Sequence, residues 1–137
     1  MDRTDVLQEL RDRLRASPFH AGLGIGVVEA SEGRVHLALQ ASAQHENLQG
    51  SIHGGVLATL ADTAMGLAVR TAIEQGRPHI TIELGVHYLR PASPGAIEAI
   101  GTVVRVGSQI AYAEADVTTP DGTLLARASG TYTVAAR

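Results

Sequence analysis

The sequence predicts an α+β fold in which an antiparallel sheet of five or six strands curls around a single long helix. The segment from about Gly54 to Glu74 is apolar on nearly all sides, which is typical of a helix that is buried nearly all round. Alternating apolar residues predict two strands before this helix and four after it. Turn formers such as those at 120–122 favour antiparallel hairpins. With 137 residues, 45% of them hydrophobic, we expect one domain over 1–137.

The first segment, 1–17, is expected to form an amphipathic helix. Four apolar residues recur there at helical spacing among charged neighbours, namely Val6, Leu7, Leu10 and Leu14. Because a proline disfavours helical backbone at the residue before it, the helix should end before Pro18. We expect this helix to act as a lid.

The strands and the loop follow from the same patterns. A hairpin is expected from strands at 25–30 and 34–40. The segment 41–55 shows neither the helical nor the strand period of apolar residues, so it should be a loop. The long helix should be capped by Gly76. Four strands are then expected at 80–89, 96–107, 109–119 and 124–134. Such a sheet leaves edges uncovered, so we expect a homo-oligomer.

Composition argues against several classes of function. The net charge is -3 and the 11 basic residues are scattered, which gives no footprint for nucleic acid or an anionic membrane. The absence of cysteine excludes thiolate metal sites and a thiol nucleophile, and it matches a cytoplasmic location. The six histidines lack metal-ligand spacing, so no metal is expected.

One carboxylate, Asp62, interrupts the apolar helix. Positions three, four and seven apart share a helical face, and by this spacing Asp62 lies with Gly55, Ala58, Thr59, Met65 and Gly66. We expect the small residues Gly55, Thr59 and Gly66 to leave room for a substrate. A buried carboxylate is costly without a partner and is usually retained for a purpose. The alternative is structural: an ion pair with Arg70 or Arg77, or a hydrogen bond with Thr59.

The helix entrance carries His53-Gly54-Gly55. The first amides of a helix have no internal partner and lie at the positive end of its dipole, so they can receive developing negative charge. Glycine lets a ligand approach this backbone, as an oxyanion hole requires. A loop that simply needs glycine torsions is the alternative, and Asn47 by itself is equally a turn former.

Together these residues carry a resemblance to a known family. Asn47, then His53-Gly54-Gly55, then Asp62 nine residues after the histidine, and then a strand with the sequence HITIELGVHYLRPA resemble the hot-dog-fold thioesterases. The similarity is to the phenylacetate-pathway and 4-hydroxybenzoyl-CoA type of acyl-CoA thioesterase, over roughly 18–135. It implies a hot-dog fold, hydrolysis of acyl-CoA without metal or organic cofactor, and homodimers that pair into a dimer of dimers.

The resemblance also implies roles for individual residues. The backbone amide of Gly54 and the side chain of Asn47 would polarise the thioester carbonyl. Asp62 would activate water or attack directly, and Thr81 would help to place the water. His53 would steady the carbonyl pocket or the departing sulfur.

The candidate contacts for the coenzyme A phosphates are less specific. They are Arg90 and the segment 105–109, in which Arg105, Gly107 and Ser108 are the residues of interest. The simpler alternative is that these residues are solvated at the surface and bind no phosphate. Coenzyme A would enter as part of the substrate rather than as a cofactor.

The spacing of Gly54 and Asp62 imposes a constraint of its own. Eight residues of helix span about 12 Å, whereas a carboxylate and an oxyanion donor must both lie about 3 Å from the reacting centre, directly or through one water. Two helices laid antiparallel across a twofold axis would place Gly54 of one chain opposite Asp62 of the other. We therefore predict a site shared by two chains.

The leading hypothesis is hydrolysis of an acyl-CoA thioester with an aryl or arylacetyl group. A hot-dog hydratase or dehydratase is one alternative; it would need a histidine base beside a carboxylate, for which His53 is the candidate. A non-catalytic acyl-CoA binding module is another, but it would not need Asp62.

Overall fold

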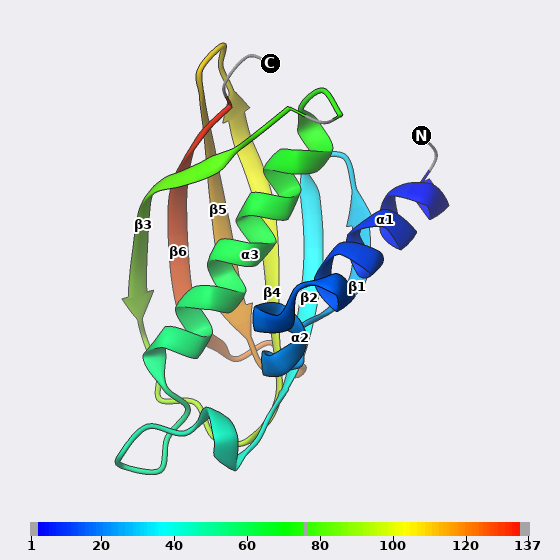
Figure 1. Ribbon diagram of the computed structural model, residues 1–137. Helices are drawn as coiled ribbons and strands as arrows, with labels where there is room; N and C mark the ends of the chain where they lie inside the picture. The colour runs from blue at the N-terminus through cyan, green and yellow to red at the C-terminus, as the bar shows by residue number, and fades with distance from the viewer. Residues whose placement is uncertain (1–2, 76, 135–137) are drawn as a thin grey trace.

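The computed structural model describes residues 3–75 and 77–134, and it contains a six-stranded antiparallel sheet with the long helix α3 across one face (Figure 1). The strand order is β1-β2-β4-β5-β6-β3. The helices are α1 (Arg3–Ala16), α2 (Pro18–Leu23), the 3₁₀ turn η1 (Ala43–His45) and α3 (Gly54–Ala72). The strands are β1 (Gly26–Ser31), β2 (Arg34–Ala41), β3 (Ile80–Tyr88), β4 (Gly95–Val106), β5 (Ile110–Thr118) and β6 (Leu124–Thr133). The predicted fold class, with two strands before the helix and four after it, is confirmed.

Helix α3 lies against the sheet at very short distance. On β4, a Cβ at Gly101 would lie only 2.4 Å from the carbonyl carbon of Ala64, so only glycine permits this approach. The helix ends at Ala72 rather than at the predicted Glu74, because Ile73 turns to extended backbone and packs against the core. The predicted cap, Gly76, lies outside the described residues.

The strands agree with the sequence patterns to within about two residues, but α2 is not predicted. The sequence pattern treats Pro18 only as the end of the first helix. In the structure Pro18 also begins a second helix, because proline fits the first helical position and the Ser17 hydroxyl accepts a hydrogen bond from the His20 amide.

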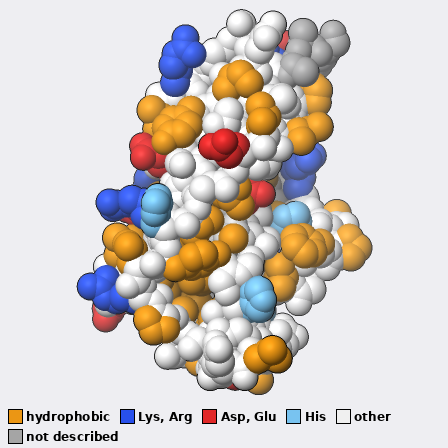
Figure 2. Space-filling model, turned by 90° about the vertical axis from the view of Figure 1, so that its left-hand side faces the viewer, with side chains coloured by type: hydrophobic (Ala, Val, Ile, Leu, Met, Phe, Trp, Pro, Cys, Tyr) orange, Lys and Arg blue, Asp and Glu red, His pale blue; other side chains and the backbone are white. Residues whose placement is uncertain are grey.

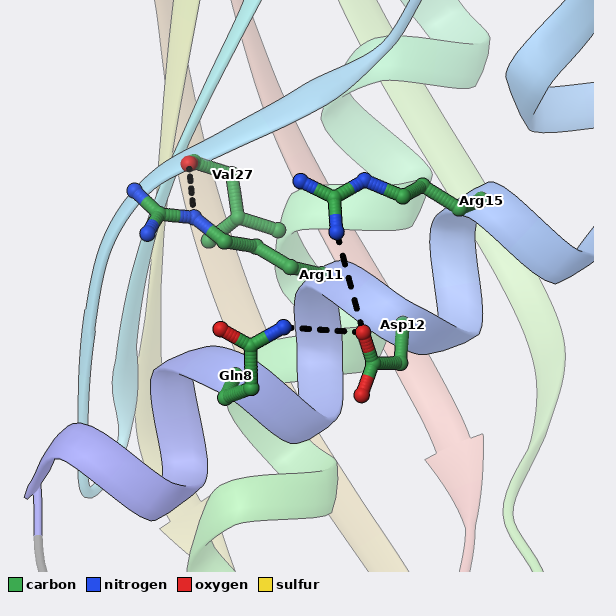
Figure 3. A network of polar contacts seen from close by, with 5 residues as sticks. All are labelled: Gln8, Arg11, Asp12, Arg15 and Val27. Carbon is green, nitrogen blue, oxygen red and sulfur yellow. Dashed lines mark hydrogen bonds and ion pairs between the residues drawn. The ribbon is translucent and has the colours of Figure 1, made fainter.

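Helix α1 is anchored in the core. The side chains of Leu10 and Leu14 are buried, and Arg70 of α3 donates to Glu9 at 2.6 Å. Figure 3 shows a second attachment, in which Arg11 donates from Nε to the Val27 carbonyl oxygen of β1 (3.2 Å). The function of α1 as a lid remains a prediction.

Strand β3 forms one edge of the sheet, and apolar side chains are exposed on it. The exposed fractions are 68% for Ile80, 53% for Ile82 and 52% for Tyr88. Figure 2 views this side of the molecule, and hydrophobic side chains are spread over much of the face. Such an edge is what the predicted pairing with another chain would cover. Across the described ranges, no helix is long and apolar enough to cross a membrane.

Candidate active site

The loop before α3 caps the helix with a histidine. The backbone amide of Gly55 donates to Nδ1 of His53 at 2.8 Å, and the amide of Val56 donates to the His53 carbonyl at 2.9 Å. Within the described part of the chain, the Gly54 amide has no acceptor. The exposed His53 ring therefore acts here as an N-cap, and Gly54 presents the one amide of this turn that is available to a ligand.

Asn47 is both a turn former and a potential donor. Its Oδ1 accepts from the backbone amides of Gln49 (2.8 Å) and Ser51 (3.1 Å). Both bonds use the carbonyl oxygen of the side chain, so they fix its orientation and leave the NH₂ group as a donor.

Asn47 and Gly54 line one cavity, which we call the entrance pocket. It has a volume of about 360 Å³ and is lined by Asn47, Gln49, Ser51, Ile52, Gly54, Leu57, Tyr88, Leu89, Arg90, Pro91 and Ala92. The Tyr88 hydroxyl donates to the Gly54 carbonyl at 2.7 Å, which holds the first turn of α3 against β3. Arg90, a candidate phosphate contact, lies in this pocket and donates to the Leu124 carbonyl at 2.9 Å.

Asp62 lies eight residues further along α3, and two hydroxyl groups bind it. Its Oδ1 accepts from Thr81 Oγ1 at 3.0 Å and from the Tyr132 hydroxyl at 2.8 Å. The Tyr132 hydroxyl also contacts the Asp62 carbonyl oxygen at 3.2 Å. Burial is the largest cause that raises the pKa of Tyr132 far above its ordinary value, followed by the charge of Asp62, so this hydroxyl stays protonated and remains a donor.

The partners that the structural alternative named for Asp62 make other bonds. Arg70 pairs with Glu9 instead, and the Thr59 hydroxyl donates to the Gly55 carbonyl at 2.8 Å. Arg77 donates to the Ser108 carbonyl at 2.7 Å. The helical spacing placed Met65 on the same face as Asp62. In the structure Met65 is instead fully buried in the core.

Asp62 opens into a second cavity, which we call the carboxylate pocket. Its volume is about 650 Å³, and it is lined by Arg13, Leu14, Ala16, Ser17, His20, Asp62, Thr63, Gly66, Leu67, His79, Ile80, Thr81 and Tyr132. Burial, followed by the charges of Arg70 and Arg13, lowers the pKa of His79, so this histidine favours its neutral form. Within one chain, the histidines that line the pocket of Asp62 are His20 and His79, whereas His53, the candidate base of the hydratase alternative, lies at the start of α3.

Of the other predicted binding residues, some line a pocket and others do not. Gly66 lines the carboxylate pocket, whereas Gly55 and Thr59 line neither pocket. Arg105 lies near the end of β4, and Gly107 and Ser108 lie in the β4–β5 turn, where the Gly107 amide donates to the Ile110 carbonyl at 2.8 Å. Ser108 contacts Arg77, beyond the C-terminal end of α3, so this turn lies far from Gly54 at the start of that helix.

Two tyrosines were missed by the sequence argument. On β6, Tyr132 follows small inward-facing residues and is the aromatic side chain on that face. A buried tyrosine needs a partner for its hydroxyl. This requirement predicts a polar partner for Tyr132 but does not identify Asp62 as that partner. Tyr88 gave no comparable signal, since it is half exposed at the end of an edge strand.

No three histidine, aspartate or glutamate side chains in residues 3–75 and 77–134 lie close enough together to hold a metal ion. The polar groups that could act on a substrate include the Gly54 amide, the Asn47 side-chain amide, the Asp62 carboxylate and the hydroxyls of Thr81 and Tyr132; Arg13, His20 and His79 also line the carboxylate pocket, and Arg90 lines the entrance pocket.

Comparison with known proteins agrees with the fold. Residues 49–126 match the thioesterase superfamily. A Halobacterium salinarum protein named as a candidate esterase is 45% identical over 74% of this chain and 70% of its own length. Human acyl-coenzyme A thioesterase 13 is 31% identical over 84% of this chain and 86% of its own length.

Solved structures give the same result. A variant of the phenylacetic acid degradation protein PaaI from Thermus thermophilus is 32% identical, with a TM-score of 0.80 over 87% of this chain and 100% of that chain. The E. coli PaaI protein has a TM-score of 0.88 over 98% of this chain and 96% of its own, at 23% identity, which speaks for the fold alone.

The hot-dog fold and these relatives define an enzyme, a thioesterase of the PaaI-like type. The chain belongs to the thioesterase superfamily. The structural similarity also extends further than the predicted 18–135, because 98% coverage includes most of α1.

Proposed function

We propose that this thioesterase hydrolyses acyl-CoA to a free acid and coenzyme A in the cytoplasm, with aryl or arylacetyl groups preferred. The observation that carries the proposal is the Asp62 carboxylate, held by two hydroxyls at the wall of a cavity in a member of this superfamily. Human acyl-coenzyme A thioesterase 13, a relative over most of the chain, supports the substrate class. The PaaI relative, named for phenylacetic acid degradation, supports the acyl preference.

In this proposal each site is shared by two chains of a homodimer, and dimers pair into a dimer of dimers. Gly54 and Asp62 line different pockets of one chain and are separated by about 12 Å of helix. The exposed apolar side chains on β3 support a second copy at this edge. The entrance pocket of one chain then meets the carboxylate pocket of its partner.

The chemistry needs only the groups in these two pockets. Asp62 takes a proton from a water as the water oxygen bonds to the thioester carbon, and Thr81 accepts a hydrogen bond from the same water. The carbonyl oxygen becomes an oxyanion, which accepts hydrogen bonds from the Gly54 amide and the Asn47 NH₂ group. The intermediate then expels the coenzyme A thiolate, which receives the proton from Asp62. His53 supports this arrangement by capping the helix that carries Gly54.

Coenzyme A is substrate in this scheme, and no cofactor takes part. Arg90 lies in the entrance pocket, which supports the proposal that it contacts a phosphate of coenzyme A. The segment 105–109, with Arg105, Gly107 and Ser108, is the further candidate for phosphate contacts.

The direct test is release of free coenzyme A from a panel of phenylacetyl, hydroxybenzoyl, short, medium and long acyl-CoA thioesters, measured with and without a chelator. We expect release to be fastest with the aryl members and unaffected by the chelator. A hydratase would change the acyl group without releasing coenzyme A, and a binding module would bind acyl-CoA without turnover. Either result would refute the proposed function.

A further inference from the structure

The Tyr132 side chain joins the last strand to the middle of α3. Its hydroxyl contacts two atoms of Asp62, Oδ1 at 2.8 Å and the backbone carbonyl oxygen at 3.2 Å. A single donor therefore restrains both the helix backbone at Asp62 and the direction of the side chain. Tyr132 is only 1% exposed, so water does not compete for these bonds.

Cross-strand pairing explains why two hydroxyls reach the same oxygen. Thr81 of β3 pairs directly with Tyr132 of β6, and side chains of directly paired residues point to the same face of a sheet. The register shifts immediately after Thr81, at a bulge before Glu83. Such bulges re-aim side chains next to functional sites.

The Tyr132 ring is placed by its packing as well as by its hydroxyl. A Cβ at Gly130 would lie 2.8 Å from the ring, and one at Gly66 would lie 3.6 Å from it. The ring therefore occupies space that the absence of a side chain at Gly130 leaves open, and Gly66 of α3 lies at van der Waals distance from it. A phenylalanine would fit the same space, so the hydroxyl can be removed with little change in packing.

The two hydroxyls bind only one of the two carboxylate oxygens of Asp62. Oδ1 of Asp62 accepts from Thr81 and Tyr132, whereas Oδ2 accepts a hydrogen bond from none of the described residues. Because both donors act on one oxygen, they fix the plane of the carboxylate and leave the other oxygen to a water.

We propose that Tyr132 is a positioning residue, whose hydroxyl holds Asp62 Oδ1 so that Oδ2 is the oxygen that takes the proton from water. This inference rests on the proposed function for the identity of the reaction. Its geometric part, the control of Asp62 by Tyr132, is independent of the substrate.

Other charged or titratable groups also face Asp62. Arg13 of α1, His20 of α2 and His79 before β3 line the same pocket. All three are retained in the variants below, so a difference between variants reports the Tyr132 hydroxyl alone.

The kinetic test compares Tyr132→Phe with wild type, in the wild-type and the Asp62→Asn backgrounds. Tyr112→Phe is the matched control, because Tyr112 lies on the neighbouring strand β5, is 38% exposed and lines neither pocket. Loss of a hydrogen bond to a charged group should lower kcat about tenfold or more with KM little changed. With Asp62 already replaced by asparagine, the same change should lower the remaining rate less than about twofold. Tyr112→Phe should match wild type.

The second test needs no turnover. Removing a donor from the carboxylate disfavours its charged form, so Tyr132→Phe should move the protonation midpoint of Asp62 to higher pH. The measurement is a ¹³C NMR titration of aspartate carboxyl carbons, with Asp62 assigned by its absence in Asp62→Asn. Should Tyr132→Phe fail to fold, 3-fluorotyrosine at position 132 is the substitute; its more acidic hydroxyl is a stronger donor and should move the midpoint to lower pH.

The outcomes separate the two proposals. A wild-type protein that releases no coenzyme A refutes the proposed function, while the titration still decides whether Tyr132 controls Asp62. A kcat for Tyr132→Phe within twofold of an active wild type overturns the positioning role. So does a loss of kcat with an unmoved midpoint, or an equal loss in the Asp62→Asn background, because a merely structural residue would produce those results.

Discussion

The entrance pocket and the carboxylate pocket lie along the same helix but are built in different ways. The donors of the entrance pocket depend on contacts between neighbours close in sequence, in the Asn47 turn and the His53 cap, although residues 88–92 also line this pocket. The carboxylate pocket depends on side chains that are distant in sequence, since Thr81 and Tyr132 reach Asp62 from two different strands. One pocket offers donors for negative charge, and the other offers a base.

This difference has a consequence for function. Donors without a base polarise a carbonyl but activate no water, and a base without donors leaves the oxyanion unstabilised. Each pocket supplies what the other lacks, yet one chain keeps them about 12 Å apart. The predictions below test the two halves separately and then together.

The largest effect is expected from the base. Asp62→Asn should lower kcat about a thousandfold, because an amide is a poor base and a poor nucleophile. The fold should survive, since the amide oxygen still accepts from Thr81 and Tyr132. Loss of the buried charge should leave the free energy of unfolding unchanged or raise it by about 1 kcal/mol. Coenzyme A release and denaturant unfolding are the measurements, and turnover within threefold of wild type would exclude Asp62 as the base.

A smaller effect is expected from the donor side. Asn47→Asp keeps the oxygen that accepts from the Gln49 and Ser51 amides, but it removes the NH₂ donor and places a negative charge near the oxyanion. Loss of one oxyanion donor lowers kcat about a hundredfold. Gln40→Glu is the control, because it makes the same chemical change on an exposed side chain of β2. Equal rates for these two variants would remove Asn47 from the site.

The same contrast explains how much the sequence could predict. Helix α3, the strands and the entrance residues follow from local patterns, because periodicity and helix capping act over a few residues. The roles assigned to Gly54 and Asp62 were implied by the family resemblance, which rests on the residues from Asn47 to Asp62 and on the strand sequence at 79–92.

The carboxylate pocket needed information that is not local. The hydrogen bond between Tyr132 and Asp62 joins residues 70 positions apart, and it depends on the pairing of β6 with β3. The order of strands, which places these two side by side at the sheet edge, is set by packing of the whole domain. The helix α2 was missed for a different reason: Pro18 both ends one helix and begins another, and the pattern identified only the first effect.

The smallest loss of activity is expected in a mixed dimer, in which one chain carries the Asn47 substitution and the other carries the Asp62 substitution. Asn47→Asp and Asp62→Asn chains should each be nearly inactive, and the experiment uses an equal mixture of them, unfolded and refolded together. In a mixed dimer one shared site carries both lesions and the other carries none. Random pairing makes about half of the dimers mixed and half of their sites intact, so about a quarter of wild-type activity should return.

The mixing experiment separates the two possible architectures of the site. If each chain contained a complete site, every site in the mixture would carry a lesion and no activity would return. Native mass spectrometry shows whether mixed dimers formed, and each variant refolded alone gives the background rate. Confirmed mixing without recovery would mean that Gly54 and Asp62 do not act on the same carbonyl. The two pockets would then need separate explanations, because the length of helix between them prevents one chain from bringing both to one thioester.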